Sequence, residues 1–249
     1  MQKRSEEATS NRPGFLFDLD GTLVDSNYQH ALAWKEALES IGFDIPTWKI
    51  HRRIGLSGSM LANELSRQTG ITLTKDQSRA ASEMHAASFN RRRDEVRVLP
   101  GAVVLLQQLT QLSVPWAIAT SGTPEDARPS LQLLDIPDNS TVITAQDVTA
   151  AKPDPGIFLV AARRLGMSPQ DCFVVGDAIW DVLAARRAGA LAVGLLTGGY
   201  SAAELTDAGA YRVLEDAEEL RRSLDLTGVH SGIAAPGSHV ADASVDNAP

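Results

Sequence analysis

The stretch GFLFDLDGTLVDS, residues 14–26, decides how the rest of the sequence is interpreted. It begins with a short apolar run, which is typical of a strand buried on both faces of a sheet. The run leads directly into Asp18 and Asp20, and Gly21 follows them. Two carboxylates this close repel each other unless a cation lies nearby. An Asx-type turn is the alternative interpretation, but such a turn needs only one Asp.

Short apolar runs alternate with helical patterns along the rest of the chain. The predicted strands are residues 14–17, 114–119, 142–144, 172–175 and 191–195, with a weaker one at 211–213. The predicted helices between them are residues 101–112, 125–134, 156–165 and 179–188, which carry apolar residues at spacings of three and four. This alternation predicts an α/β fold, a Rossmann-like doubly wound parallel sheet with helices on both faces.

Residues 26–94 interrupt the alternation, because they contain only helical stretches separated by glycines. We expect an inserted α-helical cap domain there, and a core domain made of residues 14–25 and 95–225. Ligands of doubly wound sheets bind at the carboxyl ends of the strands, so an insertion after the first strand would cover that site. Residues 1–13 and 226–249 are expected to be flexible tails, since they hold too little apolar surface to offset the entropy of ordering.

The composition excludes several classes of protein. The 249 residues are 43% hydrophobic and 22% charged, and the net charge is −8, whereas a nucleic-acid binder normally carries a basic patch. No apolar run approaches the ~18–20 residues of a membrane span, and the polar N-terminus is unlike a signal peptide. The single cysteine, Cys172, cannot form an internal disulfide. We therefore expect a cytoplasmic monomer or homodimer that binds neither nucleic acid nor a membrane.

Two further motifs follow predicted strands and carry groups that bind anions. The segment WAIATSGTPED places Thr120, Ser121 and Gly122 between a strand and a helix. Hydroxyls and amides at a helix N-terminus bind anions, although an ordinary N-cap has the same pattern. In AAKPDPGIF, Lys152 precedes Pro153 on a stiff turn just outside a helix. A solvated loop lysine is the alternative interpretation of this motif.

The fourth motif, CFVVGDAIWDVL, is a buried strand that ends at Asp177, with Asp181 four residues later. A helix-capping Asp is the alternative interpretation. However, the carboxyl ends of parallel strands meet at one edge of a sheet, so all four motifs are expected to converge. Clustered carboxylates require a hard cation such as Mg²⁺, while the lysine, hydroxyl and amides would neutralise a phosphoryl group.

These four motifs, in this order, resemble those of the haloacid dehalogenase superfamily over roughly residues 14–215. The pattern is most similar to the phosphoglycolate phosphatase-like and β-phosphoglucomutase-like hydrolases with a helical cap. The resemblance implies a Mg²⁺-dependent phosphatase that hydrolyses a small phosphate monoester through an aspartyl-phosphate intermediate. Its partner would then be a small phosphorylated metabolite.

The resemblance also implies a role for each catalytic residue. Asp18 matches the nucleophile, and Asp20 matches the general acid and base. Thr120 matches the hydroxyl of the second motif, and Lys152 matches the lysine that orients Asp18 and the phosphoryl group. Dehalogenases carry an aromatic residue at the position of Asp20 and phosphonate hydrolases carry alanine, so Asp20 favours phosphate monoesters.

The remaining positions of the motifs are implied to bind phosphate or metal. Ser121 and Gly122 offer amides to the phosphate next to Thr120. Asp177 matches the Mg²⁺ ligand, together with Asp18 and the main-chain carbonyl of Asp20. Asp181 is expected to act through water or through the lysine.

The cap is expected to set specificity, and its candidate residues are His30, Arg52, Arg53 and Ser57. His30 occupies the position of a hinge histidine in sugar phosphomutases, but many phosphatases share that stretch. Gly58 stands where those mutases carry an arginine for the second phosphate, which weakens the mutase alternative unless Arg52 or Arg53 substitutes. A solvated basic face is the other interpretation of the two arginines.

Two other functional classes fit these residues less well than a phosphatase does. A catalytically inactive phosphate-binding protein is disfavoured by the complete set of motif residues. A nucleotide-binding enzyme lacks support, because no glycine-rich phosphate loop follows any predicted strand.

Overall fold

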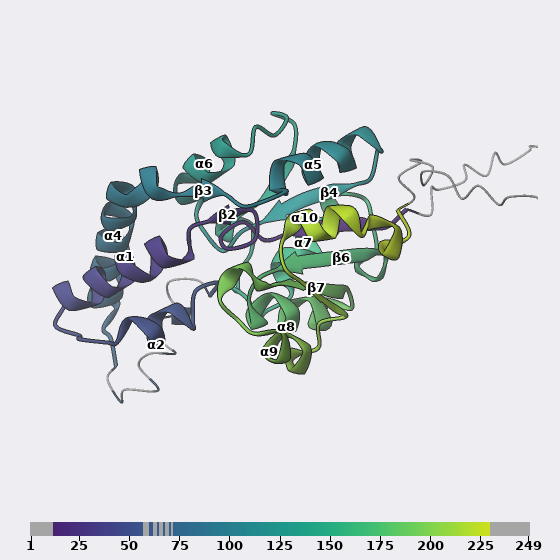
Figure 1. Ribbon diagram of the computed structural model, residues 1–249. Helices are drawn as coiled ribbons and strands as arrows, with labels where there is room; N and C mark the ends of the chain where they lie inside the picture. The colour runs from purple at the N-terminus through teal and green to yellow at the C-terminus, as the bar shows by residue number, and fades with distance from the viewer. Residues whose placement is uncertain are drawn as a thin grey trace, which may run out of the picture.

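The computed structural model describes residues 12–229, except residues 57–59, 62–63, 65–66, 68–69 and 71. Its centre is a six-stranded sheet with the order β5-β4-β1-β6-β7-β8, in which every neighbouring pair is parallel (Figure 1). The strands are β1 (Gly14–Phe17), β4 (Trp116–Ala119), β5 (Thr141–Ile143), β6 (Cys172–Gly176), β7 (Leu191–Leu195) and β8 (Arg212–Leu214). The predicted α/β fold class is therefore confirmed.

Each of the six predicted strands is found within two residues of its expected start. The largest difference is at β4, which begins at Trp116 instead of residue 114. Ser113 has a positive φ of 54°, and the Val114 N–H donates to the carbonyl of Leu109 at 2.9 Å. The two residues before Pro115 therefore close the preceding helix rather than extend the sheet.

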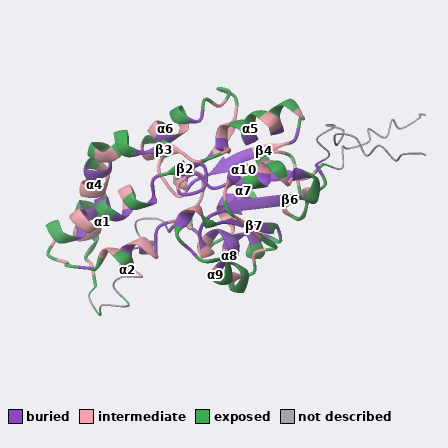
Figure 2. Ribbon diagram, viewed as in Figure 1, coloured by how far each residue is buried: buried purple, intermediate pink, exposed green. Residues whose placement is uncertain are grey.

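Helices cover both faces of the sheet, and the strands alternate between two buried clusters. Phe15 and Phe17 of β1 face one cluster, and Leu16 faces the other, as the two-residue period of a strand requires. Figure 2 shows the central strands as buried along their length. The core helices are α5 (Ala102–Gln111), α6 (Pro124–Leu133), α7 (Gly156–Arg164), α8 (Ile179–Ala188), α9 (Ala202–Ala208) and α10 (Ala217–Arg222). The short 3-10 helices are η1 (Arg93–Glu95), η2 (Ala145–Asp147), η3 (Pro169–Asp171), η4 (Leu196–Gly198) and η5 (Leu224–Thr227).

The helical block between the first two core strands lies to one side of the sheet (Figure 1). Its described helices are α1 (Asn27–Ser40), α2 (Thr47–His51) and α4 (Lys75–Arg92), and they share a buried cluster that is separate from the two core clusters. We refer to residues 26–94 as the cap. The antiparallel pair β2 (Val24–Asp25) and β3 (Arg97–Val98) joins its two ends to the core, so the chain leaves and re-enters at one place.

The folded part extends beyond the expected start of the C-terminal tail. Val229 is buried in the same cluster as residues of α5 and α10, although the tail was expected to begin at residue 226. The rest of both expected tails, residues 1–11 and 230–249, lies outside the described residues. Among the described residues, no helix combines the length and the apolar character needed to span a bilayer.

Replacing Leu109 with alanine tests the packing of α5 on the sheet. Leu109 is fully buried, so we expect L109A to lower the free energy of unfolding by about 2–5 kcal/mol. Val104 lies on the same helix but is 52% exposed, and V104A should change this free energy by less than about 0.5 kcal/mol. Urea unfolding followed by circular dichroism measures both values, and equal losses would contradict the assigned packing.

Candidate active site

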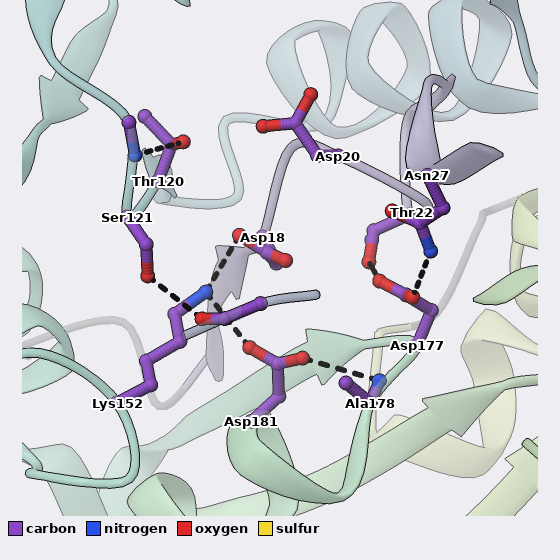
Figure 3. Close-up of polar contacts among 12 residues, drawn as sticks. Asp18, Asp20, Thr22, Asn27, Thr120, Ser121, Lys152, Asp177, Ala178 and Asp181 are labelled. Carbon is purple, nitrogen blue, oxygen red and sulfur yellow. Dashed lines mark hydrogen bonds and ion pairs between the residues drawn. The ribbon is translucent and has the colours of Figure 1, made fainter. Parts of the chain in front are cut away.

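The four motifs converge at the carboxyl ends of the central strands (Figure 3). Asp18 follows β1, Thr120 follows β4 and Asp177 follows β6, while Lys152 lies in the turn before α7. Because β1 is hydrogen-bonded to both β4 and β6, the ends of these three strands are immediate neighbours. The predicted convergence of the motif residues is thus present in the structure.

Lys152 links two of the carboxylates and is fully buried. Its Nζ lies 2.6 Å from Asp18 Oδ1 and 2.8 Å from Asp181 Oδ1. Burial alone would lower the pKa of Lys152, but the two carboxylates more than compensate and the pKa is raised. This lysine is therefore a permanently charged group that fixes Asp18 and is not a solvated loop residue.

Asp18, Asp177 and Asp181 form a buried cluster of carboxylates, with one oxygen of each within 4.8 Å of the others. When fully ionised, the three carboxylates and one ammonium group would carry two net negative charges. Burial raises the pKa of Asp18, and burial followed by the charge of Asp181 raises the pKa of Asp177 to about 7. An all-oxygen donor set with this charge fits a hard divalent cation such as Mg²⁺.

Asp181 contributes to this cluster more directly than the sequence predicted. Its contact with Lys152 agrees with the expected action through the lysine, but its carboxylate also lies among the candidate metal ligands. Its Oδ2 accepts a hydrogen bond from the Ala178 N–H at 3.2 Å, so it also caps α8. Asp181 therefore caps α8, as the alternative interpretation of the fourth motif predicted, and also lies in the carboxylate cluster.

Sequence reasoning missed the two residues that hold Asp177. The Thr22 hydroxyl donates to Asp177 Oδ1 at 2.8 Å, and the Asn27 amide donates to Asp177 Oδ2 at 2.9 Å. Both side chains are buried; Thr22 lies within the first motif, and Asn27 directly follows it. A Cβ atom at Gly198 would approach Asp177 Oδ2 to 1.9 Å, so only glycine fits beside this carboxylate.

Asp20 points away from the carboxylate cluster and toward the cap (Figure 3). Its Oδ1 accepts a hydrogen bond from Ser26 at 2.7 Å and lies 3.3 Å from His30 Nε2. Burial alone would raise the pKa of Asp20, but His30 and Ser26 outweigh it and the pKa is lowered. Only its main-chain carbonyl was expected to bind metal, and its carboxylate is not among the clustered groups.

His30 is held in turn by a second histidine that the sequence did not single out. His30 Nδ1 lies 3.1 Å from Nε2 of His85 on α4, and Phe89 stacks on the His30 ring at 3.9 Å between centroids. His85 also stacks on Trp34 at 4.3 Å. Burial, followed by the charge of His30, lowers the pKa of His85 to about 3, so His85 is neutral at physiological pH.

A cavity of about 290 Å³ lies between the core and the cap, next to Asp18 and Asp20. Its other lining residues are His30, Trp34, Ile54, Gly55, Leu56, Ser82, His85, Ser121, Gly122, Thr123, Asp126, Ala127 and Ala145. Ser121 donates to the carbonyl of Gly55 at 3.0 Å, which joins the second motif to the cap. Thr120 is buried below this loop, where its hydroxyl accepts from the Gly122 N–H at 3.0 Å.

The candidate arginines of the cap do not line the cavity, and this part of the expectation needs correction. Arg52 forms an ion pair with Glu204 and lies over the ring of Tyr200, so its charge is directed toward the core helix α9. Arg53 is nearly buried and donates to the carbonyl of Lys49. Ser57 lies outside the described residues. His30 is the cap candidate that the structure brings to the site.

Comparison with known proteins now identifies the family. A sequence model described as haloacid dehalogenase-like hydrolase matches residues 13–189. The chain belongs to this family of hydrolases. The predicted family is thereby confirmed.

Several relatives are similar over most of their length. A solved structure, a hydrolase from Pseudomonas syringae, is 46% identical with a TM-score of 0.85, covering 86% of this chain and 99% of that one. Hexitol phosphatase A of Escherichia coli is 36% identical, over 71% of this chain and 79% of the relative. Phosphoglycolate phosphatase of Shigella dysenteriae is 33% identical, over 78% and 84% of the two chains. The β-phosphoglucomutase of Bacillus subtilis is 30% identical, over 72% and 81%.

Neutralising Asp177 should have opposite effects on metal binding and on the stability of the metal-free protein. D177N removes a ligand charge, so we expect Mg²⁺ to raise the Tm much less than in the wild type. In EDTA at pH 8, relief of the buried repulsion should raise the Tm by roughly 2–4 °C, the shift that about 1 kcal/mol gives at this chain length.

The matched control is D171N, which removes an exposed carboxylate just before the same strand. Thermal unfolding with Mg²⁺ and with EDTA measures both variants. Full Mg²⁺ stabilisation in D177N, or a lower Tm in EDTA, would contradict the assignment of this cluster as a cation site.

Proposed function

We propose that the chain is a Mg²⁺-dependent phosphatase that hydrolyses a small phosphate monoester through an aspartyl phosphate on Asp18. The observation that carries the proposal is the buried Lys152, which holds Asp18 at the floor of the cavity while Asp20 lies at its wall. The names of the hexitol and phosphoglycolate phosphatases among the relatives support phosphate ester hydrolysis.

The residues around Asp18 can neutralise a bound phosphoryl group. Lys152 supplies a fixed positive charge, and the Ser121 and Gly122 segment lines the same cavity. Mg²⁺ would be held by Asp18, Asp177 and the Asp20 carbonyl, with Asp181 close enough to join them, and would supply the positive charge that lets a phosphate dianion approach these carboxylates.

In the first step, a carboxylate oxygen of Asp18 attacks phosphorus and the bond between phosphorus and the ester oxygen breaks. Asp20 gives its proton to the leaving oxygen, which departs as an alcohol. In the second step, Asp20 takes a proton from water, and the hydroxide formed attacks phosphorus. The bond to Asp18 breaks, orthophosphate is released and both carboxyl groups return to their starting state.

His30 assists Asp20 in both steps by carrying its proton. Because His30 lowers the pKa of Asp20, this carboxyl is ionised in the free site and needs a proton before it can act as an acid. His30 Nε2 is a proton carrier within reach at 3.3 Å. His85 holds the opposite nitrogen of His30 and is therefore a positioning residue in this mechanism.

A sugar phosphomutase is the alternative, and the similarity to β-phosphoglucomutase favours it. Such an enzyme returns the phosphoryl group from Asp18 to a second hydroxyl of a sugar and must therefore bind a bisphosphate. The cavity offers no lining Lys or Arg among the described residues for a second phosphate. The proposal for hydrolysis therefore stands ahead of the mutase.

The intermediate can be trapped chemically. We expect borohydride to reduce an acyl phosphate at Asp18 to homoserine during turnover, and mass spectrometry of the peptide should locate it. D18N should show neither trapping nor phosphate release. D20N should slow release by at least about 100-fold, the usual contribution of a general acid and base. Turnover by D18N at the wild-type rate would overturn the proposed nucleophile.

The role of His85 can be separated from a structural one by the choice of leaving group. An alkoxide needs the Asp20 proton, whereas p-nitrophenolate leaves without it. We expect H85A to lower kcat/KM about tenfold for an alkyl phosphate and less than about threefold for p-nitrophenyl phosphate. H85N should recover part of the loss because it keeps a hydrogen-bonding group. Equal losses for both esters would show that His85 only supports packing, and E83A on the same helix is the control.

A further inference from the structure

The wall of the cavity that faces the leaving group differs in character from the phosphate end. Trp34, Ile54 and Leu56 give it apolar surface from the cap, and Ser82 gives it a neutral hydroxyl. No Lys or Arg is among the described residues that line it. Asp126 contributes a carboxylate, which accepts a hydrogen bond from Thr123 at 2.7 Å. The wall therefore offers no charged partner to a second anionic group.

The two histidines do not change this conclusion. His30 has both ring nitrogens engaged, one with Asp20 and one with His85. The ring of His85 is stacked on Trp34 and is half-buried. Neither imidazole is free to pair with an anion on the substrate without breaking the contacts that hold Asp20.

The cations of the cap are placed elsewhere. Arg52 is paired with Glu204, and Arg53 donates to the cap backbone. Arg67 is exposed and paired with Glu64. The ten residues within 57–71 whose structure is not described include no Lys, Arg or His in the sequence. This stretch of the cap therefore has no further basic residue to contribute to the cavity wall.

We infer that the leaving group is a hydroxyl-bearing carbon chain without a second negative charge, so that the substrate is a sugar or sugar-alcohol phosphate rather than a phosphorylated carboxylate or a bisphosphate. This inference rests on the proposed phosphatase activity. The apolar residues would pack against the carbon skeleton, and the Asp126 carboxylate can accept hydrogen bonds from hydroxyls. The Ser82 hydroxyl donates to the Ser78 carbonyl at 3.0 Å and can still accept a hydrogen bond.

The charge around the cavity leads to the same class of substrate. A carboxylate placed there would lose its hydration beside Asp126 and gain no cation in exchange. The site should therefore reject a second negative charge strongly.

Matched substrate pairs test this directly. Glycerol 3-phosphate and 3-phosphoglycerate differ only in a CH₂OH group replaced by a carboxylate, and so do sorbitol 6-phosphate and 6-phosphogluconate. With the full chain and Mg²⁺, we expect kcat/KM to favour the uncharged member of each pair by at least about 30-fold. Equal or better hydrolysis of the carboxylates or of phosphoglycolate would overturn the inference.

A charge placed in the wall should relax the discrimination. Ser82 is an exposed position of α4 that borders the cavity, so S82K should fold and bring a cation to the wall. We expect the preference in each pair to fall at least about fivefold in S82K, mainly through a lower KM for the carboxylate. A87K adds the same charge at an exposed position of the same helix that does not border the cavity, and its preference should match the wild type.

The two levels of proposal fail in different ways. Absence of phosphate release from every ester, in a protein that is stabilised by Mg²⁺, would overturn the phosphatase proposal. Release that favours the carboxylates in the wild type, or an unchanged preference in S82K, would overturn only the inference on the leaving group. Isomerisation of β-glucose 1-phosphate without release would favour the mutase instead.

Discussion

The ammonium group of Lys152, buried between Asp18 and Asp181, is the interaction on which the rest of the site depends. A charge taken this far from water is tolerated only when close partners replace its hydration. The two ion pairs therefore fix the relative positions of three segments: the turn before α7, the end of β1 and the start of α8. Asp177 then adds a carboxylate that the lysine cannot neutralise, and this excess of negative charge is what suits the cluster to a cation.

Under the proposed function, the cap would take part in the chemistry as well as cover the cavity. Asp20 is connected to α4 through His30 and His85, and Ser121 is connected to the cap through the Gly55 carbonyl. Since His85 also borders the cavity, the group that supports the proton carrier is in contact with the substrate space. A substrate that fills the cavity well would stabilise the same arrangement that orients Asp20.

The fold and the four motifs could be predicted because both are local in sequence: apolar runs mark the strands, and polar residues follow them. The supporting residues could not. Thr22 and Asn27 reach a partner about 150 positions away, and nothing local marks them as its ligands. Arg52 was a reasonable anion ligand until the structure placed Glu204 beside it. Val229 is buried, but it lies in a stretch of small and polar residues, so the composition of that stretch does not predict its burial.

Under the proposed function, the division of charge between the two ends of the cavity would set which substrates this hydrolase can discriminate. At the phosphate end, fixed charges and a cation would recognise one dianion, and any phosphate monoester presents it. At the other end, apolar packing and single hydrogen bonds to flexible hydroxyls differ little between similar polyols, because a methylene is worth only ≈ 1–3 kcal/mol. A second charge is a much larger perturbation in the same space. We therefore expect sharp selection against anionic leaving groups and broad tolerance among sugars.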